Sequence, residues 1–137
     1  MIFFTADTHF CHAKIIESCA RPFESVDEMN FVMIKNWNSL VTRHDEVYIL
    51  GDFMYKGSAD GANKILAKLN GKKYLIKGNH ERYLSKPEFK ADAFEWVKDY
   101  HVLNFEKIDF VLSHFPMLSW HKSYRGYFIV RRFSCQC

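Results

Sequence analysis

Four short apolar segments of this chain are each followed at once by residues that bind metal ions or transfer protons. The segments cover residues 2–6, 46–50, 73–77 and 108–112. The residues that follow carry carboxylate, amide or imidazole groups: Asp7, His9, Asp52, Asn79, His80 and His114. If the segments are parallel strands, their carboxyl ends lie at one edge of a sheet, where these side chains can converge. The sequence therefore predicts one candidate site built from four separate parts of the chain.

These residue types suit a pair of divalent metal ions that act on a phosphate ester. Two metals about 3.5–4 Å apart lower the pKa of a shared water and hold the phosphate group. One carboxylate must bridge the two ions, and Asp52, which follows a central segment, suits that role. Asp7 and His9 lie two residues apart in an expected extended loop. Their side chains would therefore point the same way and could hold one metal together.

The second metal would take its ligands from the third and fourth segments. The amide oxygen of Asn79 and a ring nitrogen of His114 are natural ligands for it. His80 directly follows Asn79 and so faces elsewhere, which leaves it available as a general acid or as a stabiliser of the phosphoryl group. Mixed oxygen and nitrogen ligands favour Mn, Fe, Zn or Ni over calcium. The identity of the two metals, Mg included, stays open.

Each of these motifs also has a purely structural explanation when it is taken alone. A glycine and aspartate after a strand, here Gly51 and Asp52, commonly form only a turn. A lone histidine such as His114 more often makes a hydrogen bond than binds a metal. The Gly-Asn-His-Glu sequence at 78–81 is more specific, because Gly-Asn favours a tight turn whereas histidine adds nothing to it. All the motifs together, each after an apolar segment, favour a functional site.

Helices are expected between the apolar segments, because apolar residues recur there at helical spacing. The expected helices cover residues 12–20, 25–41 and 62–69. The second begins with a capping box, Ser25 with Glu28 three residues later. Strands and helices therefore alternate over the first 77 residues, which argues for parallel strands joined by crossover helices. Residues 96–105 are expected to form a strand or an irregular pair of strands, and 115–125 a loop.

The composition limits the classes of protein to which the chain can belong. Its 137 residues suffice for one domain with a hydrophobic core. No segment approaches the ~20 apolar residues of a membrane span, and the start does not resemble a signal peptide. We therefore expect a soluble, cytoplasmic protein without a membrane partner. A nucleic-acid partner is only weakly supported, because the net charge is +3 and aromatic and basic residues do not alternate.

The ordered set of motifs resembles that of the calcineurin-like metallophosphoesterases. The matching motifs are Asp7-x-His9, Gly51-Asp52, Gly78-Asn79-His80-Glu81 and His114. Segments outside these motifs also resemble the small bacterial and phage branch of that family: residues 7–10, 21–23, 36–38, 69–73 and 114–117. The resemblance covers about residues 1–126. It implies an α/β fold in which a two-sheet sandwich is flanked by helices.

The resemblance also implies a function and roles for residues. The implied function is the hydrolysis of phosphomonoesters or phosphodiesters, with a small-molecule phosphate ester or a nucleotide as substrate. The implied cofactors are two divalent metal ions. The implied metal ligands are Asp7, His9, Asp52, Asn79 and His114. Asp52 would bridge the two ions, and His80 would be the catalytic histidine.

The chain departs from the family pattern at two places. The pattern ends with Gly-His-x-His, which adds one ligand to each metal, and no such motif follows His114. We therefore expect an incomplete domain at 1–126, without its last strands, and an atypical tail at 127–137 that arises from a frameshift or a truncation. The second departure follows Asp52, where Tyr55 stands in the segment that replaces Asp-Arg-Gly of the protein-phosphatase branch. Tyr55 cannot orient His80 as an aspartate would.

Two functional hypotheses follow. The first is a metal-dependent phosphoesterase, whose activity the missing ligands would impair. The second is an inactive remnant of a phosphoesterase fold that serves as a binding or structural module. The intact positions of all five remaining ligands favour the enzyme, whereas the missing final motif favours the remnant.

Overall fold

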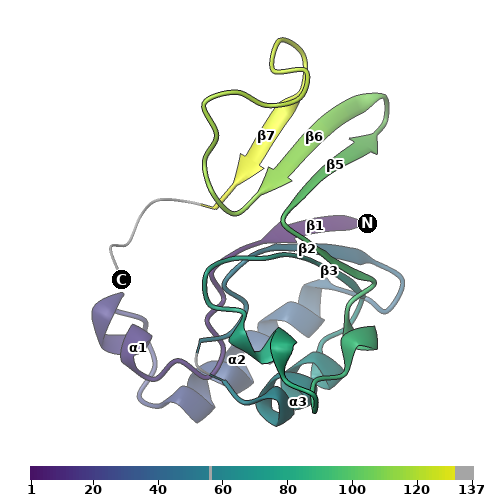
Figure 1. Ribbon diagram of the computed structural model, residues 1–137. Helices are drawn as coiled ribbons and strands as arrows, with labels where there is room; N and C mark the ends of the chain where they lie inside the picture. Colours follow the sequence, from purple (N-terminus) through teal and green to yellow (C-terminus); the bar gives the residue numbers. More distant parts are fainter. Residues whose placement is uncertain (56, 132–137) are drawn as a thin grey trace.

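Two β-sheets form the framework of the molecule, shown in Figure 1 as a computed structural model that describes residues 1–55 and 57–131. In the first sheet, parallel strands lie in the order β1-β2-β3-β4. These strands are β1 (Ile2–Thr5), β2 (Glu46–Leu50), β3 (Lys72–Ile76) and β4 (Trp96–Lys98). In the second sheet, β5 and β6 are antiparallel, and β6 and β7 are parallel. Its strands are β5 (Tyr100–Phe105), β6 (Ile108–Ser113) and β7 (Tyr127–Val130).

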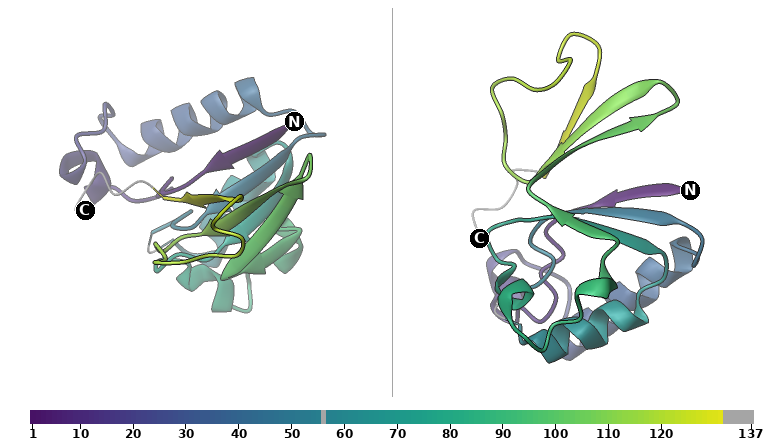
Figure 2. Two further views of the ribbon diagram at one scale, coloured as in Figure 1. Left: turned by 90° about the horizontal axis from the view of Figure 1, so that it is seen from above. Right: turned by 45° about the vertical axis from the view of Figure 1, so that its right-hand side comes forward.

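Helices cover the face of the first sheet that points away from the second sheet (Figures 1 and 2). The helices that the structure describes are α1 (Lys14–Ser18), α2 (Val26–Leu40), α3 (Ala59–Lys68) and the 3-10 turns η1 (Arg82–Ser85) and η2 (Ala91–Ala93). α2 connects β1 to β2 and α3 connects β2 to β3, as expected for crossover helices between parallel strands. The arrangement confirms the predicted α/β fold of two sheets flanked by helices.

The ends of the helices follow local capping, and two of them differ from the prediction. Ser25 caps α2 as predicted, since its hydroxyl accepts the backbone N–H of Glu28. α1 is shorter than the predicted helix at 12–20, because Cys11 and Ala20 have φ angles of 63° and 48°, outside the helical range. α3 begins before the predicted residue 62, because the Ser58 hydroxyl already accepts the N–H of Gly61.

Elements pack on both faces of the first sheet, which explains why β2 is buried and apolar from Val47 to Leu50. Along β2, Val47 and Ile49 pack with the helices, whereas Tyr48 and Leu50 pack toward the second sheet. Tyr48 and Leu50 belong to the same hydrophobic cluster as Leu112 of β6, between the two sheets. A two-sheet sandwich therefore holds β2 on both sides and fixes the position of the residues that follow it.

The predicted strand or strand pair at 96–105 is a pair of strands that belong to different sheets. β4 pairs with β3 in the first sheet, and β5 pairs with β6 in the second, with Asp99 between them. The chain thus passes from one sheet to the other within a single residue. Figure 2 shows the two sheets close together near this crossing and diverging away from it.

The carboxyl ends of β1, β2, β3 and β6 lie at the same end of the molecule, at the left of Figure 1. β7 lies beside β6 and runs in the same direction, so its end also reaches this region. The expected tail at 127–137 thus begins with a strand of the second sheet, whereas residues 132–137 lie outside the described part of the chain. Among the helices at residues 1–55 and 57–131, none is long and apolar enough to span a membrane.

Candidate metal centre

The loops after β1, β2 and β6 bring three metal-binding groups together. Asp7, Asp52 and His114 each offer one ligand atom, and these three atoms lie within 4.8 Å of one another. His9 joins them, because its Nε2 lies 3.9 Å from Asp7 Oδ1 and 3.8 Å from Asp52 Oδ2. Asn79 joins from the loop after β3, with its Oδ1 3.3 Å from Nε2 of His114. The structure therefore brings together all five residues that the sequence predicts as metal ligands.

Backbone hydrogen bonds hold the first two loops side by side beyond the ends of their strands. The N–H of Asp7 donates to the carbonyl of Gly51, and the N–H of His9 donates to the carbonyl of Asp52, both at 3.0 Å. Asp7, His9 and Asp52 adopt left-handed conformations, with φ angles of 50°, 50° and 53°. The prediction of an extended loop from Asp7 to His9 was therefore wrong, although their side chains do meet. Such backbone strain is concentrated at functional sites.

Arg21 supports this strained loop from α1's far end. Its guanidinium donates to the carbonyl of Thr8 at 2.8 Å and to the carbonyl of Asp7 at 2.9 Å. These two bonds satisfy two successive backbone carbonyls of the loop. Arg21 lies in the segment 21–23, which resembles the corresponding segment of the calcineurin-like metallophosphoesterases. In the structure it positions the loop after β1.

The two oxygens of Asp52 have different surroundings. Asp52 is 1% exposed. Its Oδ1 accepts the backbone N–H groups of Asn79 at 3.1 Å and His80 at 3.2 Å. Its Oδ2 instead faces the ring nitrogens of His9 and His114. The backbone of the loop after β3 thus orients the carboxylate and leaves one oxygen directed into the cluster.

A hydrogen bond to the backbone determines which nitrogen of His114 faces the cluster. His114 is fully buried, and its Nδ1 donates to the carbonyl of Leu50 at 2.7 Å. In the neutral ring Nε2 then carries a lone pair, the state in which histidine binds metals. Nε2 lies 3.6 Å from Asp52 Oδ2 and 3.3 Å from Asn79 Oδ1. His114 Nε2, Asp52 Oδ2 and Asn79 Oδ1 are therefore three acceptor atoms that face one another in a buried place. A cation between them would satisfy all three, so the residues present suit a bound metal.

Burial keeps His9 in the neutral state that metal binding requires. Loss of solvent lowers the pKa of His9 to about 4, and the neighbouring Asp52 carboxylate opposes this only in part. Burial also raises the pKa of Asp7, while the positive charge of Arg131 opposes this rise. His9 Nδ1 is buried and has no hydrogen-bond partner among the residues that the structure describes. The neutral ring and the clustered carboxylates agree with a cation-binding site.

His80 lies beside the cluster rather than within it. Its Nε2 accepts a hydrogen bond from the side-chain amide of Asn79 at 2.9 Å. Its ring centre lies 5.8 Å from that of His9 and 4.7 Å from that of Tyr55, which meets it edge-on. Tyr55 therefore contacts His80 through its ring. The structure places His80 at the border of the cluster, and its role outside the metal ligands stays a prediction.

Glu81 is a residue of the candidate site to which the sequence reasoning assigned no role. Its Oε1 accepts the backbone N–H of Phe53 at 2.8 Å, and its Oε2 accepts that of Gly78 at 2.7 Å. Burial raises the pKa of Glu81 to about 7 against the lowering effect of these bonds. Glu81 thus joins the loop after β2 to the loop after β3. Glu81 is the last residue of the Gly-Asn-His-Glu sequence, but only the fold shows that it binds the backbone of two loops.

Arg131 is the second residue that sequence reasoning missed. Its Nη1 lies 3.4 Å from Asp7 Oδ1 and 3.4 Å from Asp52 Oδ2. Arg131 follows β7, within the segment that the sequence treats as an atypical tail. No local motif signals its position, because it depends on the pairing of β7 with β6.

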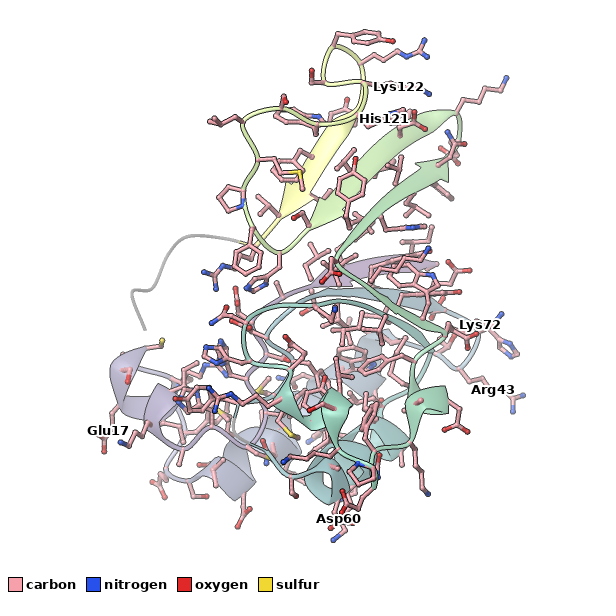
Figure 3. All side chains as sticks on the ribbon, viewed as in Figure 1. Glu17, Arg43, Asp60, Lys72, His121 and Lys122 are labelled. Carbon is pink, nitrogen blue, oxygen red and sulfur yellow. The ribbon has the colours of Figure 1, made fainter. Side chains whose placement is uncertain are left out.

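A cavity of about 350 Å³ lies elsewhere, at the amino ends of β3 and β4 and beside α3, and none of the candidate ligands lines it. Arg43 and Lys72 mark this end of the first sheet in Figure 3. One of its lysines is engaged with the backbone, since Lys73 Nζ donates to the carbonyls of Leu69 and Gly71 at 2.9 Å. The clustered acceptors at the carboxyl ends of the strands are therefore the better candidate site.

Comparison with known proteins agrees with this geometry. Residues 1–106 match the calcineurin-like phosphoesterase family, which is most of the chain. The chain belongs to this family. The match contains all the candidate ligands except His114, which lies beyond it. The family typically binds metals, and the Asp7, Asp52 and His114 cluster is consistent with this.

The similar family members come from archaea, phages and bacteria. An uncharacterized protein of Methanocaldococcus jannaschii is 38% identical over 93% of this chain and 66% of its own length. The gene 66 protein of Mycobacterium phage L5 is 31% identical over 88% of this chain and 65% of its own length. The chain thus spans just under two thirds of these relatives.

A solved structure shows that the similarity extends to the fold. The crystal structure of a protein of unknown function from Aquifex aeolicus matches with a TM-score of 0.66 and 29% sequence identity. The match covers 85% of this chain and 61% of that protein. The two-sheet architecture is therefore shared with this solved protein.

Proposed function

We propose that this chain is a metal-dependent phosphoesterase that hydrolyses phosphomonoesters or phosphodiesters at a site for two divalent ions. The observation that carries the proposal is the group of acceptor atoms around His114 Nε2, which a bound cation would satisfy. Membership of the calcineurin-like phosphoesterase family supports the class of reaction. A small-molecule phosphate ester or a nucleotide is the substrate class that this chemistry suits.

In this proposal the five ligand residues divide between the two ions. Asp7 and His9 would hold the first, and Asn79 and His114 would hold the second. Asp52 would serve both ions through the carboxylate that the loop backbone orients. Two divalent ions, when bound, lower the pKa of a shared water and neutralise charge on the phosphoryl oxygens. Mn, Fe, Zn, Ni and Mg all remain candidates for the metals.

His80 supplies the remaining chemistry in this proposal. Its ring borders that of His9, with 5.8 Å between the two ring centres. From there it protonates the leaving group or stabilises the phosphoryl group. In the part of the chain that the structure describes, its side chain contacts the Asn79 amide and the Tyr55 ring, which are neutral partners.

The position of Arg131 favours a second candidate function, a phosphoesterase fold that binds without hydrolysis. The guanidinium lies against two of the carboxylates that would hold metal. If it stays there permanently, the chain is a binding or structural module.

The Asp52→Asn variant distinguishes the two candidates. We expect the unaltered chain to retain divalent metal on purification and to hydrolyse a generic aryl phosphodiester with added manganese. Asp52→Asn removes the bridging charge, so we expect it to abolish both metal content and hydrolysis, a loss of at least 100-fold. Asp60→Asn is the matched control, because Asp60 is exposed on the outer side of the helical layer and pairs with Lys64 (Figure 3). Hydrolysis that is absent in the unaltered chain, or unchanged in Asp52→Asn, would favour the binding module.

A further inference from the structure

Arg131 reaches the candidate metal centre because of the register of the second sheet. β7 pairs in parallel with β6, and Val130 is the partner of Ser113. The next residue on each strand, Arg131 and His114, therefore lies at the same level, and both side chains reach the carboxylates of the centre. The position of Arg131 thus follows from four successive residue pairs between β6 and β7 rather than from one contact.

The guanidinium contacts the same carboxylate oxygens that face the candidate histidine ligands. Nη1 of Arg131 is 3.4 Å from Asp52 Oδ2, the oxygen that His9 and His114 also face. It is also 3.4 Å from Asp7 Oδ1, the oxygen nearest to His9. A single nitrogen therefore bridges both carboxylates from the side on which a metal would bind them.

The Asp7 and Asp52 carboxylates can be neutralised by the Arg131 guanidinium or by a divalent metal ion, but not by both at the same place. Asp52 is 1% exposed and the Arg131 side chain only 27% exposed, so water screens their attraction incompletely. Without a counter-charge, the Asp7 and Asp52 carboxylates would repel each other at close range. With a divalent ion bound between them, the guanidinium in its present position would instead be repelled.

We propose that Arg131 is an internal counter-ion that occupies the metal-binding side of Asp7 and Asp52 and must move away before a divalent ion binds. The inference rests on the proposed function, in which these two carboxylates are metal ligands. It predicts that Arg131 stabilises the chain without metal and weakens its affinity for metal. The same residue thereby links the strand β7 to the occupancy of the centre.

The test compares manganese binding by the full chain and by charge-neutral variants, measured by isothermal titration calorimetry after treatment with a chelator. Arg131→Gln removes the competing charge, so we expect it to bind Mn²⁺ about tenfold more tightly, equivalent to about 1.4 kcal/mol. Arg131→Met removes the same charge but keeps the aliphatic part of the side chain, so it serves if the glutamine variant does not fold. Arg131→Lys keeps the charge, and we expect its affinity to stay within about twofold of the unaltered chain.

Arg125→Gln is the matched control, because Arg125 is exposed in the turn before β7 and lies over the ring of Tyr124. It undergoes the same change of charge, so we expect unchanged manganese affinity. Thermal unfolding in chelator gives a second readout. Arg131→Gln should melt at a lower temperature than the unaltered chain, and added Mn²⁺ should reverse the difference.

Each result decides between the ideas. If both neutral Arg131 variants bind Mn²⁺ as tightly as the unaltered chain or more weakly, the counter-ion proposal is wrong. The binding of manganese itself would still support the proposed function. Weaker binding would mean that Arg131 supports the centre instead, for example by holding the loops together. If even the unaltered chain and Arg131→Gln bind no manganese at millimolar concentration, the proposed metal centre fails first, and the counter-ion fails with it.

Discussion

At the scale of single residues, the absence of a side chain at two glycines decides whether the candidate ligands can meet. A Cβ on Gly78 would collide with Asp52 Oδ1 and lie 2.7 Å from the backbone nitrogen of Asp52 and 2.9 Å from His114 Cε1. A Cβ on Gly51 would collide with the His114 ring and lie 2.8 Å from Gly78 Cα. The glycines therefore let the loops after β2 and β3 touch the buried histidine.

Gly78→Ala tests this close packing. Because the clash involves backbone and a fully buried ring, we expect a loss of about 2 kcal/mol in the free energy of unfolding, typical of overpacking. Displacement of Asp52 or His114 should also weaken manganese affinity. Urea denaturation in chelator and calorimetric titration measure the two effects.

The control for that variant is Gly61→Ala, in which the added methyl group lies within α3, 3.2 Å from the Ser58 hydroxyl. Alanine is favoured over glycine inside helices by up to about 1 kcal/mol, which offsets this contact. Its stability should therefore change little, and its metal affinity not at all. Full stability and metal affinity in Gly78→Ala would show that the loops can separate without cost.

At the scale of the elements, one ion pair joins the strand β6 to the loop that leads into β7. Asp109 of β6 accepts hydrogen bonds from Lys122 Nζ and from the side chain of Asn104, both at 2.6 Å. Lys122 lies at the outer end of the second sheet, far from the candidate centre (Figure 3). This contact therefore holds the connection that brings β7, and so Arg131, to its place.

The pH dependence of Asp109→Asn tests this contact. Hydrogen bonds from Lys122 and then from Asn104 hold the pKa of Asp109 below its ordinary value of 3.8. A carboxylate whose pKa is lower in the folded chain stabilises it above the unfolded pKa and loses that effect as the pH falls. Asp109→Asn should therefore melt at a lower temperature than the unaltered chain at pH 7, and the difference should shrink below about pH 4.

Melting curves from pH 7 to pH 3 measure this difference, with Asp92→Asn as the control at an exposed aspartate. The control should follow the unaltered chain throughout. A gap between Asp109→Asn and the unaltered chain that persists unchanged at pH 3 would mean that the carboxylate charge is not what stabilises the connection.

At the scale of the whole molecule, the candidate centre draws on both sheets. Asp7, Asp52 and Asn79 follow strands of the first sheet, whereas His114 follows β6 of the second. The two sheets converge toward this end of the molecule and diverge away from it, as Figure 2 shows. A cation held by all of these groups would therefore stabilise the packing of one sheet on the other.

Manganese should consequently raise the melting temperature of the complete chain. A ligand at 100 times its Kd adds about 2.7 kcal/mol to the stability, so we expect a rise of several degrees. Calcium should raise it less, because it suits mixed nitrogen and oxygen ligands poorly. Thermal unfolding at increasing metal concentration measures both. No rise with manganese in a chain that nevertheless binds it would show that the ion binds the unfolded chain equally well, and so does not depend on the two sheets being packed together.

The sequence was sufficient for the features that depend on local patterns. The apolar segments at 46–50 and 108–112 are strands, and the polar residues after them converge because parallel strands end at the same edge. The capping of α2 by Ser25 also follows from a local rule. Family resemblance added the two-sheet arrangement, which periodicity alone does not determine.

The features that the sequence did not predict depend on contacts between distant segments. The left-handed backbone at Asp7 and His9 follows from hydrogen bonds to the loop after β2. Glu81 binds two backbone groups from different loops. Arg131 reaches the carboxylates only through the register of β7 against β6. None of these can be derived from the neighbours of the residue along the chain.

Asp52 has a left-handed φ of 53°, so two separate properties restrict this position: the negative charge of its side chain and the conformation of its backbone. Among residues with a Cβ, asparagine and aspartate tolerate that conformation best, whereas β-branched residues are strongly disfavoured. An asparagine there changes the charge but keeps the turn, and a valine would damage the turn before any question of charge arises. Asparagine substitution thus isolates the electrostatics of the bridging position from its geometry.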